Sequence, residues 1–326
     1  MLRRAIGLGL LGLGACLLGA ALAVRLFLVP GLVKLPLDQV AHPEGHGSNV
    51  SFFDIGEQQQ RTGLEADVQQ NVQGEPDAPG ASGDVAVWNY GSVISDTDGN
   101  LLNASTYRVC IDRHTAEAVA GCESTHVDYD RKAEITGLTL TFPFGTEKRD
   151  YDVFNATAGQ AFPAKFDGED TIEGVDVYRF VQTIPETVVK QTEVTGAMAG
   201  VPDEDSVMAD IVYTNERTMW VEPTSGVIVT AEEHPDTVVR GPDGTTGVTM
   251  LAGDFAGTDK TLADGVERAK DTRSQITMVK TALPLLLAGV GLVLVLLGLF
   301  LGRRALRDDD GSQAPVADTQ RVPQVQ

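Results

Sequence analysis

Two long apolar runs, one near each end of the chain, constrain this fold more than any other feature. Ala5–Val24 is apolar or small throughout, and Ala282–Leu301 is a second such run, broken only by Pro284. About 20 residues at a helical rise of about 1.5 Å cross a bilayer core of about 30 Å. The sequence therefore predicts two transmembrane helices, over residues 5–29 and 282–301.

Arginine residues flank both runs on the sides that face the chain ends. Arg3 and Arg4 precede the first run, and three arginines follow the second within residues 303–307. Positive residues beside a span mark its cytoplasmic side. We therefore expect a two-pass protein of the cell membrane, with residues 1–4 cytoplasmic at one end and 302–326 at the other. Residues 32–279 would then lie outside the cytoplasm.

The first run has two competing interpretations. Ala21-Leu22-Ala23 fits a signal-peptidase site, which would make this run a cleaved signal sequence. Leu13-Gly14-Ala15-Cys16 looks like a lipoprotein processing site, but the residues after Cys16 stay apolar. Apolar residues also continue past Arg25 to Val29, and this favours a retained anchor. All three interpretations leave the middle region outside the cytoplasm.

Glycines recur within both runs. Gly7, Gly9 and Gly12 spell G-x-G-x-x-G, but inside a membrane segment the pattern is no dinucleotide site, since that motif must link a strand to a helix. Gly298 and Gly302 form G-x-x-x-G at the same expected depth of the second span. Small residues let helices approach closely. These five glycines predict a helix contact, with glycines that merely face lipid as the alternative.

The region between the spans shows mainly strand patterns. Leu138, Leu140 and Phe142 alternate with threonines, which is the period of a half-buried strand. Asp98-Gly99 and Pro223-Thr224-Ser225-Gly226 are turn signals between apolar runs. The sequence predicts an α+β protein, with a mainly antiparallel β ectodomain over 32–279, a C-terminal helix and two flanking transmembrane helices.

Three further segments allow local predictions, two between the spans and one after the second span. Val175–Ile184 is apolar on both faces, which suits a strand between a core and a covering layer or one lining a cavity. Thr261–Val279 has apolar residues near helical spacing and predicts a helix leading into the second span. Residues 302–326 are polar, with Gly and Pro, and predict a disordered tail.

Charge excludes one class of partner. The 326 residues include 25 Lys and Arg against 46 Asp and Glu, a formal net charge of −21. Proteins that bind nucleic acids carry basic surfaces, so we expect no nucleic-acid partner. The lipid bilayer is the partner that the spans imply, and no protein partner can be named from the sequence.

Two cysteines lie outside the apolar runs. Cys110 and Cys122 would meet an oxidising compartment under the predicted topology, so a disulfide is expected. His114 and His126 follow these cysteines at equal spacing, which leaves a two-Cys, two-His zinc set as the alternative. That set lacks the tight cysteine pair of structural zinc sites.

Catalytic signatures are absent from the sequence. It contains neither the nucleophile elbow G-x-S-x-G nor the phosphate-binding G-x-x-x-x-G-K-[ST]. His42-Pro43-Glu44-Gly45-His46 resembles a metalloprotease motif, but Pro43 and Gly45 oppose the helix that the chemistry needs. We expect no enzyme activity, no catalytic or metal site and no cofactor.

Several segments resemble a known family. They include Phe142–Tyr151, Gly174–Phe180, Cys110–Arg113 and Trp220–Gly226. With the two apolar runs, they resemble an actinobacterial membrane family of unknown function that is often labelled porin PorA. The resemblance covers most of the chain and implies no catalytic or binding residues. The layout of two terminal anchors and a β-rich ectodomain also looks like that of class B scavenger receptors, which bind and pass lipids.

Three functions follow as hypotheses. The first is an anchored cell-envelope ectodomain that binds or passes lipid or other apolar ligands. The second is an oligomeric channel or porin, as the family label implies. The third is a scaffold for other envelope proteins. An enclosed cavity in the ectodomain would favour the first, polar residues lining a helix bundle the second, and a broad exposed apolar patch the third.

Overall fold

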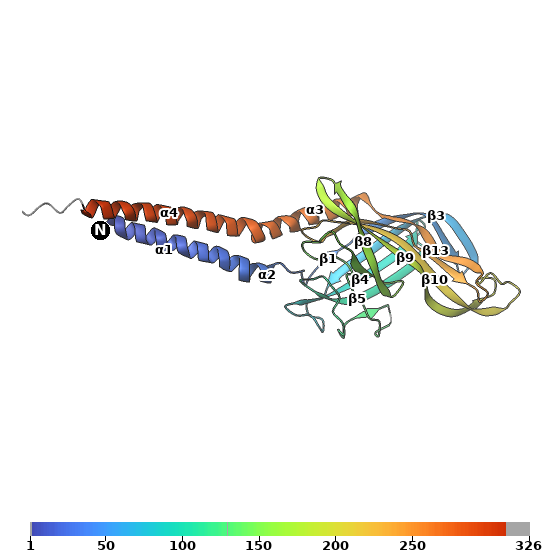
Figure 1. The fold of residues 1–326 in the computed structure, drawn as a ribbon. Coiled ribbons are helices and arrows are strands. Elements are labelled where there is room, and N and C mark those ends of the chain that lie inside the picture. The colour runs from blue at the N-terminus through green and yellow to red at the C-terminus, as the bar shows by residue number, and fades with distance from the viewer. Residues whose placement is uncertain (1, 129, 311–326) are drawn as a thin grey trace, which may run out of the picture. The chain divides into compact units, whose positions relative to one another are not determined.

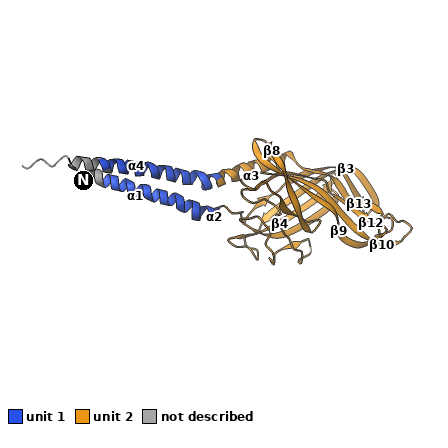
Figure 2. Ribbon diagram, viewed as in Figure 1, with its two compact units in different colours: residues 1–32, 277–326 blue, residues 33–276 orange. Residues whose placement is uncertain are grey.

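The computed structural model describes residues 2–128 and 130–310. These divide into two compact units (Figure 2): unit 1 lies within residues 1–32 and 277–326, and unit 2 is Val33–Ile276. Residues 311–326 of the predicted tail lie outside the described residues. The two units are taken in turn.

Unit 1 is helical (Figure 1). It contains α1 (Leu2–Ala23), the π-helical η1 (Val24–Leu28), α2 (Val29–Leu32), the π-helical η2 (Met278–Ala282) and α4 (Leu283–Asp310). Two helical stretches among the described residues are long and apolar enough to cross a membrane, Ala5–Leu28 and one within Asp259–Leu301. Residues 302–310, which the sequence assigned to a disordered tail, continue helix α4 instead.

The helices α1 and α4 pack along a seam of small residues spaced seven apart. Gly7, Gly14 and Ala21 are buried on α1, and Gly291 and Gly298 are buried on α4. A Cβ added at Gly14 would lie 2.7 Å from the Gly291 carbonyl oxygen, and one at Gly298 would lie 2.7 Å from that of Gly7. These pairs show an antiparallel contact with no room for side chains. A seven-residue repeat of this kind keeps two helices in register along a left-handed crossing.

The structure corrects part of the predicted contact between the glycines of the two spans. Gly7 and Gly298 do meet, but Gly9 and Gly12 are exposed, and no described atom lies within 4 Å of a Cβ added at either. The surroundings of Gly302 lie outside the described side chains. The physical reason is the period: at 3.6 residues per turn, positions 9 and 12 point away from a face that carries 7 and 14.

Unit 2 is built on one sheet. Among the described residues it has 13 strands: β1 (Val40–Ala41), β2 (Glu44–Asp54), β3 (Gln59–Gly74), β4 (Val85–Asp96), β5 (Leu101–Asp112), β6 (His126–Val127), β7 (Tyr151–Asn155), β8 (Gln160–Ile172), β9 (Val175–Thr195), β10 (Ser206–Val221), β11 (Ile228–Glu233), β12 (Asp236–Arg240) and β13 (Thr246–Gly257). The helix α3 (Asp259–Thr277) follows.

The strand order is β6-β5-β4-β3-β2-β13-β11-β10-β9-β8-β7, with β1 on β3 and β12 between β10 and β13. The pairings between named strands are antiparallel, such as β9 with β10 and β4 with β5. Short hairpins make most of these neighbours, as the turn signals predict. The predicted fold class, an antiparallel sheet with a C-terminal helix and two apolar helices, is confirmed.

The sheet closes on itself through two short segments. The backbone N–H of Val119 donates to the Cys110 carbonyl on β5 at 2.8 Å, and that of Ala118 donates to the Gly137 carbonyl at 2.9 Å. Leu138 then pairs with β7, where its N–H donates to the Asp152 carbonyl at 2.8 Å. Backbone hydrogen bonds therefore run from β5 to β7, and the two ends of the strand order are joined around an interior.

The helix α3 covers part of the outer face of the sheet. Val175 and Val177 on β9 form a buried cluster with Val229 on β11 and with Val266 and Ala269 on α3. Phe180 and Ile184, on the other face of β9, are buried inside the sheet. The double-faced apolar pattern of β9 thus reflects a strand between a core and a covering layer, which was one of its two predicted explanations.

Candidate functional site: the interior of the closed sheet

A continuous row of directly paired residues follows the inner face of the sheet. Direct partners on antiparallel strands point to the same side, so the strand register shows which residues share a face. Starting from β7, the row is Tyr151, Ala164, Gln182, Arg217, Glu233, Phe255, Gly47, Ala66 and Asp96. Tyr151 and Ala164 belong to the main apolar core, which places this face on the inside.

One half of the interior is filled by apolar side chains. Trp88 and Val109, on β4 and β5, belong to the same buried cluster as Phe180, Met219 and Val221, on β9 and β10. These strand pairs are well separated in the sheet order, so the cluster spans the interior rather than one stretch of sheet. Its members are almost fully buried, which is the dense packing of a protein core.

The other half is polar and less filled. Arg217 Nε lies 3.0 Å from Glu233 Oε1, and Asn215 Nδ2 donates to Glu233 Oε2 at 3.3 Å. Both charged side chains face inward, yet 22% of the Arg217 side chain and 33% of the Glu233 side chain remain exposed. These exposed fractions show that solvent reaches this part of the inner face.

Apolar residues also face this space. Leu64 on β3 shares the inner face of that strand with Ala66, and Ile94 on β4 pairs directly with the buried Val68. Phe255 on β13 is the direct partner of Glu233. Leu64, Ile94 and Phe255 are each partly exposed. The open half therefore offers an apolar wall beside a polar cluster.

The protonation states of the cluster follow from burial and from the ion pair. Burial raises the pKa of Tyr213 to about 12, and burial followed by the Glu233 carboxylate raises the pKa of Tyr90. Burial opposes the charged form of Arg217, but the Glu233 carboxylate and the nearby tyrosines outweigh it and raise its pKa. At neutral pH the tyrosines are therefore protonated, and Arg217 is charged beside Glu233.

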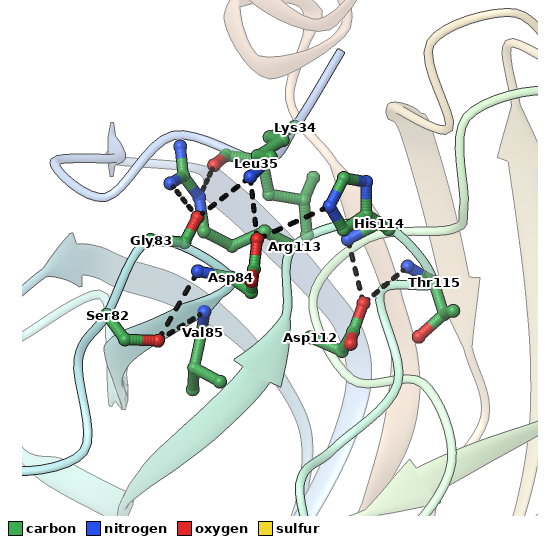
Figure 3. Close-up of polar contacts among 10 residues, drawn as sticks. All are labelled: Lys34, Leu35, Ser82, Gly83, Asp84, Val85, Asp112, Arg113, His114 and Thr115. Atoms are coloured by element: carbon green, nitrogen blue, oxygen red, sulfur yellow. Dashed lines mark hydrogen bonds and ion pairs between the residues drawn. The ribbon is translucent and has the colours of Figure 1, made fainter. Parts of the chain in front are cut away.

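The chain enters unit 2 through a fixed segment (Figure 3). Lys34 Nζ lies 2.6 Å from Asp84 Oδ1, and the hydrogen bond from Lys34 lowers the pKa of that carboxyl. Arg113 donates from Nη1 to the Gly83 carbonyl at 2.8 Å and from Nε to the Leu35 carbonyl. The side chain of Leu35 is buried in the main core. Residues 34 and 35 are thus part of the folded domain.

A hollow lies outside the sheet, beside α3. It measures about 530 Å³ and is lined by acidic residues such as Asp170, Asp176 and Glu222, together with Arg273. Asp170 already binds Arg179 at 2.7 Å and accepts from the Trp220 indole at 3.0 Å. These bonds fix the position of Asp170 at the rim of the hollow. They also leave this carboxylate with little capacity to bind a ligand.

The predicted disulfide between Cys110 and Cys122 is confirmed. Because both cysteines are in the disulfide, they are not available as ligands of the alternative two-Cys, two-His zinc site. His114 instead lies 3.6 Å from Asp84, and His126 pairs with Arg108 through the backbone of β6 and β5. The disulfide ties β5 to the loop that closes the sheet, since Val119 in that loop bonds the Cys110 carbonyl.

Removal of the disulfide should destabilise unit 2. Cys122→Ser should lower the free energy of unfolding by about 2–3 kcal/mol, because the bond closes a loop with a sequence separation of 12 and so restricts the unfolded chain. Thermal unfolding of the full chain in detergent, followed by near-UV circular dichroism, measures the change. Cys16→Ser alters a free, exposed thiol and is the control. An equal effect of the two substitutions would contradict this role for the disulfide.

Sequence patterns alone did not single out the inner polar cluster. Its signal is a change of polarity along one face of β10: Tyr213, Asn215, Arg217, Met219 and Val221 alternate with outward residues, and only the last two are apolar. A charged residue in phase with a buried face is unusual. Without the register of the neighbouring strands, however, nothing indicates that Glu233 lies beside Arg217.

Comparisons with known proteins agree on one family. Residues 6–300 match the Porin PorA family. A relative named Porin PorA from Corynebacterium amycolatum is 28% identical, with 71% of this chain and 77% of the relative covered. Another protein of the same name, from Corynebacterium resistens, is 25% identical, with 66% of this chain and 70% of the relative covered.

Proposed function

The chain belongs to the Porin PorA family, and we propose that it is a membrane-anchored envelope protein that binds an amphipathic or apolar ligand, such as a lipid, inside the closed sheet of unit 2. The protein is a membrane protein, with two helices able to span the bilayer. In this proposal both termini are cytoplasmic and unit 2 lies outside, because arginines flank the outer ends of both spans.

One observation carries the proposal: two charged side chains on the inner face of the closed sheet, Arg217 and Glu233, keep solvent-accessible surface. Closed sheets of about eight strands are just wide enough to be filled or to hold one small ligand, and the diameter grows with strand number. Ten named strands, β5 to β7 through β2 and β13, lie on this closed path among the described residues. The exposed surface of Arg217 and Glu233 inside it fits a space that a ligand can occupy.

Two neighbouring glutamines on β3 provide the test. Gln70 is half-buried and shares the inner face with Val68 and Val72, whereas Gln69 is exposed on the outer face. Gln70→Trp should fill the interior, and Gln69→Trp should leave it open. Both variants change the same residue type to the same bulky side chain, one position apart.

The measurement uses a pyrene-labelled fatty acid and its glycerol monoester, titrated separately into the full chain in detergent. We expect at least one probe to bind the wild-type protein and the Gln69→Trp variant. Gln70→Trp should weaken that binding by about tenfold or more, because the indole takes the place of the ligand. If neither probe binds, or if both variants bind like the wild type, the proposal is wrong.

The name of the relatives supports a second candidate, an oligomeric channel. Such a channel would need polar groups along its membrane path, and residues 282–301 contain none. The interior of unit 2, with its polar half, is the better candidate for a passage in this chain. Stepwise ion conductance of the purified full chain in planar bilayers would favour the channel instead.

A further inference from the structure

Each of the two spans carries a basic residue at the end that leads into unit 2, besides the arginines at its other end. Arg25 lies in the π-helical η1, and Lys280 lies in the π-helical η2. Positive residues orient a span when they gather on one side of it. Because each span has basic residues at both ends, orientation does not explain Arg25 and Lys280.

The register of the helix seam places these two cations at the same level of the helix pair. Gly14 meets Gly291, and Arg25 and Lys280 each lie eleven residues further along their helices in the direction of unit 2. Arg25 is also about 20 residues from Ala5, which is about 30 Å of helix and the thickness of a bilayer core. Both cations therefore lie at the edge of the hydrocarbon core, at the level of lipid phosphates.

Both cations are available to a partner from the bilayer. Neither side chain forms a hydrogen bond or an ion pair with a described residue. Arg25 follows seven residues after Leu18, which packs against Gly291 in the seam. The wider turn of the π-helix interrupts that spacing, and Arg25 is exposed while Lys280 is half-buried. Short π-helical turns inside α-helices are rare and are frequent at functional sites.

Large apolar side chains lie beside the two cations in the sequence. Leu26 and Phe27 in η1 are 57% and 79% exposed, and Met278 in η2 is 66% exposed. A long basic side chain at the end of a span reaches the polar edge of the bilayer, while apolar neighbours stay in contact with acyl chains. This combination fits a phosphate that carries acyl chains better than it fits a free phosphate.

We infer that this end of the helix pair binds an anionic phospholipid. The phosphate accepts hydrogen bonds from Arg25 and Lys280, and the acyl chains lie against Leu26, Phe27 and Met278. A head group with a net negative charge gains from both cations, whereas the positive group of a zwitterionic lipid opposes them. The site belongs to unit 1 and does not depend on the ligand proposed for unit 2.

Native mass spectrometry of the full chain in detergent tests this site, with dioleoylphosphatidylglycerol and dioleoylphosphatidylcholine titrated separately. The two lipids share their acyl chains and differ in the net charge of the head group. We expect the wild type to bind the phosphatidylglycerol about tenfold more tightly than the phosphatidylcholine. In the double variant Arg25→Gln, Lys280→Gln this preference should fall below about threefold, because both cations of the site are gone.

A matched double variant controls for general attraction between charges. Arg303→Gln with Arg304→Gln removes two positive charges from the other end of the spans and should keep the preference. Arg25→Lys with Lys280→Arg retains both charges of the site and should keep it too. Glycerol phosphate, at the concentration of the lipid, should not displace it. A wild type without the preference, an equal loss in the control pair, or displacement by glycerol phosphate would contradict this lipid site.

Discussion

Gly137→Ala should destabilise unit 2 by about 3 kcal/mol or more. Gly137 has a φ of +72°, and its carbonyl accepts the hydrogen bond from Ala118 that closes the sheet. A Cβ added there would lie 2.4 Å from the Asp152 carbonyl oxygen. The substitution therefore combines a left-handed backbone with a steric clash at the closure.

Gly145→Ala separates these two causes. Gly145 has a similar φ of +75°, but no described atom lies within 4 Å of an added Cβ. It should cost only about 1 kcal/mol, from the backbone conformation alone. Thermal unfolding of both variants in detergent gives the comparison. Equal losses of stability would mean that the closure between residues 118, 137 and 152 contributes nothing.

Gly14→Leu should force α1 and α4 apart, which is the second large effect. A Cβ at Gly14 would lie 2.7 Å from the Gly291 carbonyl oxygen and 2.8 Å from the backbone nitrogen of Val295, so the backbones must move. We expect the distance between the helices to grow by about 2–4 Å, toward the spacing of helices that pack with large side chains. Gly12→Leu adds the same side chain two positions away, on the exposed side, and should change nothing.

Spin labels on Leu13→Cys and Leu292→Cys report this distance by pulsed electron paramagnetic resonance. Both positions are exposed, and a Cys16→Ser background leaves no other free thiol among the described residues. An unchanged distance in Gly14→Leu would contradict the seam. An increase in Gly12→Leu as large as that in Gly14→Leu would also contradict it.

Local patterns in the sequence were sufficient for the spans, the antiparallel sheet and the disulfide. Each depends on residues close in the chain: an apolar run of about 20 residues, strand alternation with turn signals, or two cysteines in one compartment. The alternation over residues 138–142 was misleading, because this described segment forms no strand and only Leu138 makes isolated bridges. The apolar faces of β9 were predictable for the same reason. The sequence alone could not decide between its two explanations, because α3, which covers Val177, lies far along the chain.

The closure of the sheet and the inner polar cluster were not predictable. Closure depends on Ala118, Gly137 and Asp152, which come from three separate segments with no shared pattern. The cluster needs the register that sets Gln182 beside Arg217, and Arg217 beside Glu233. A one-residue shift of a strand would turn each of these side chains outward, and the sequence alone does not fix that register.

The contact between the two apolar helices was predicted only in part from the spacing of their glycines. The predicted contact used the four-residue spacing of Gly298 and Gly302, which is a known signal of close helix packing. The structure uses the seven-residue spacing of Gly7 with Gly14 and of Gly291 with Gly298. Both spacings occur in these glycine-rich spans, and only the geometry of the helix pair decides which of them is used.

Native mass spectrometry of the full chain, released gently from its own membrane, tests the central claim most directly. We expect the wild-type protein and Gln69→Trp to carry a bound amphipathic or apolar molecule, which organic extraction then identifies. Gln70→Trp should appear at the mass of the chain alone. A wild-type protein without any bound molecule, or a molecule retained equally by Gln70→Trp, would contradict ligand binding inside the closed sheet.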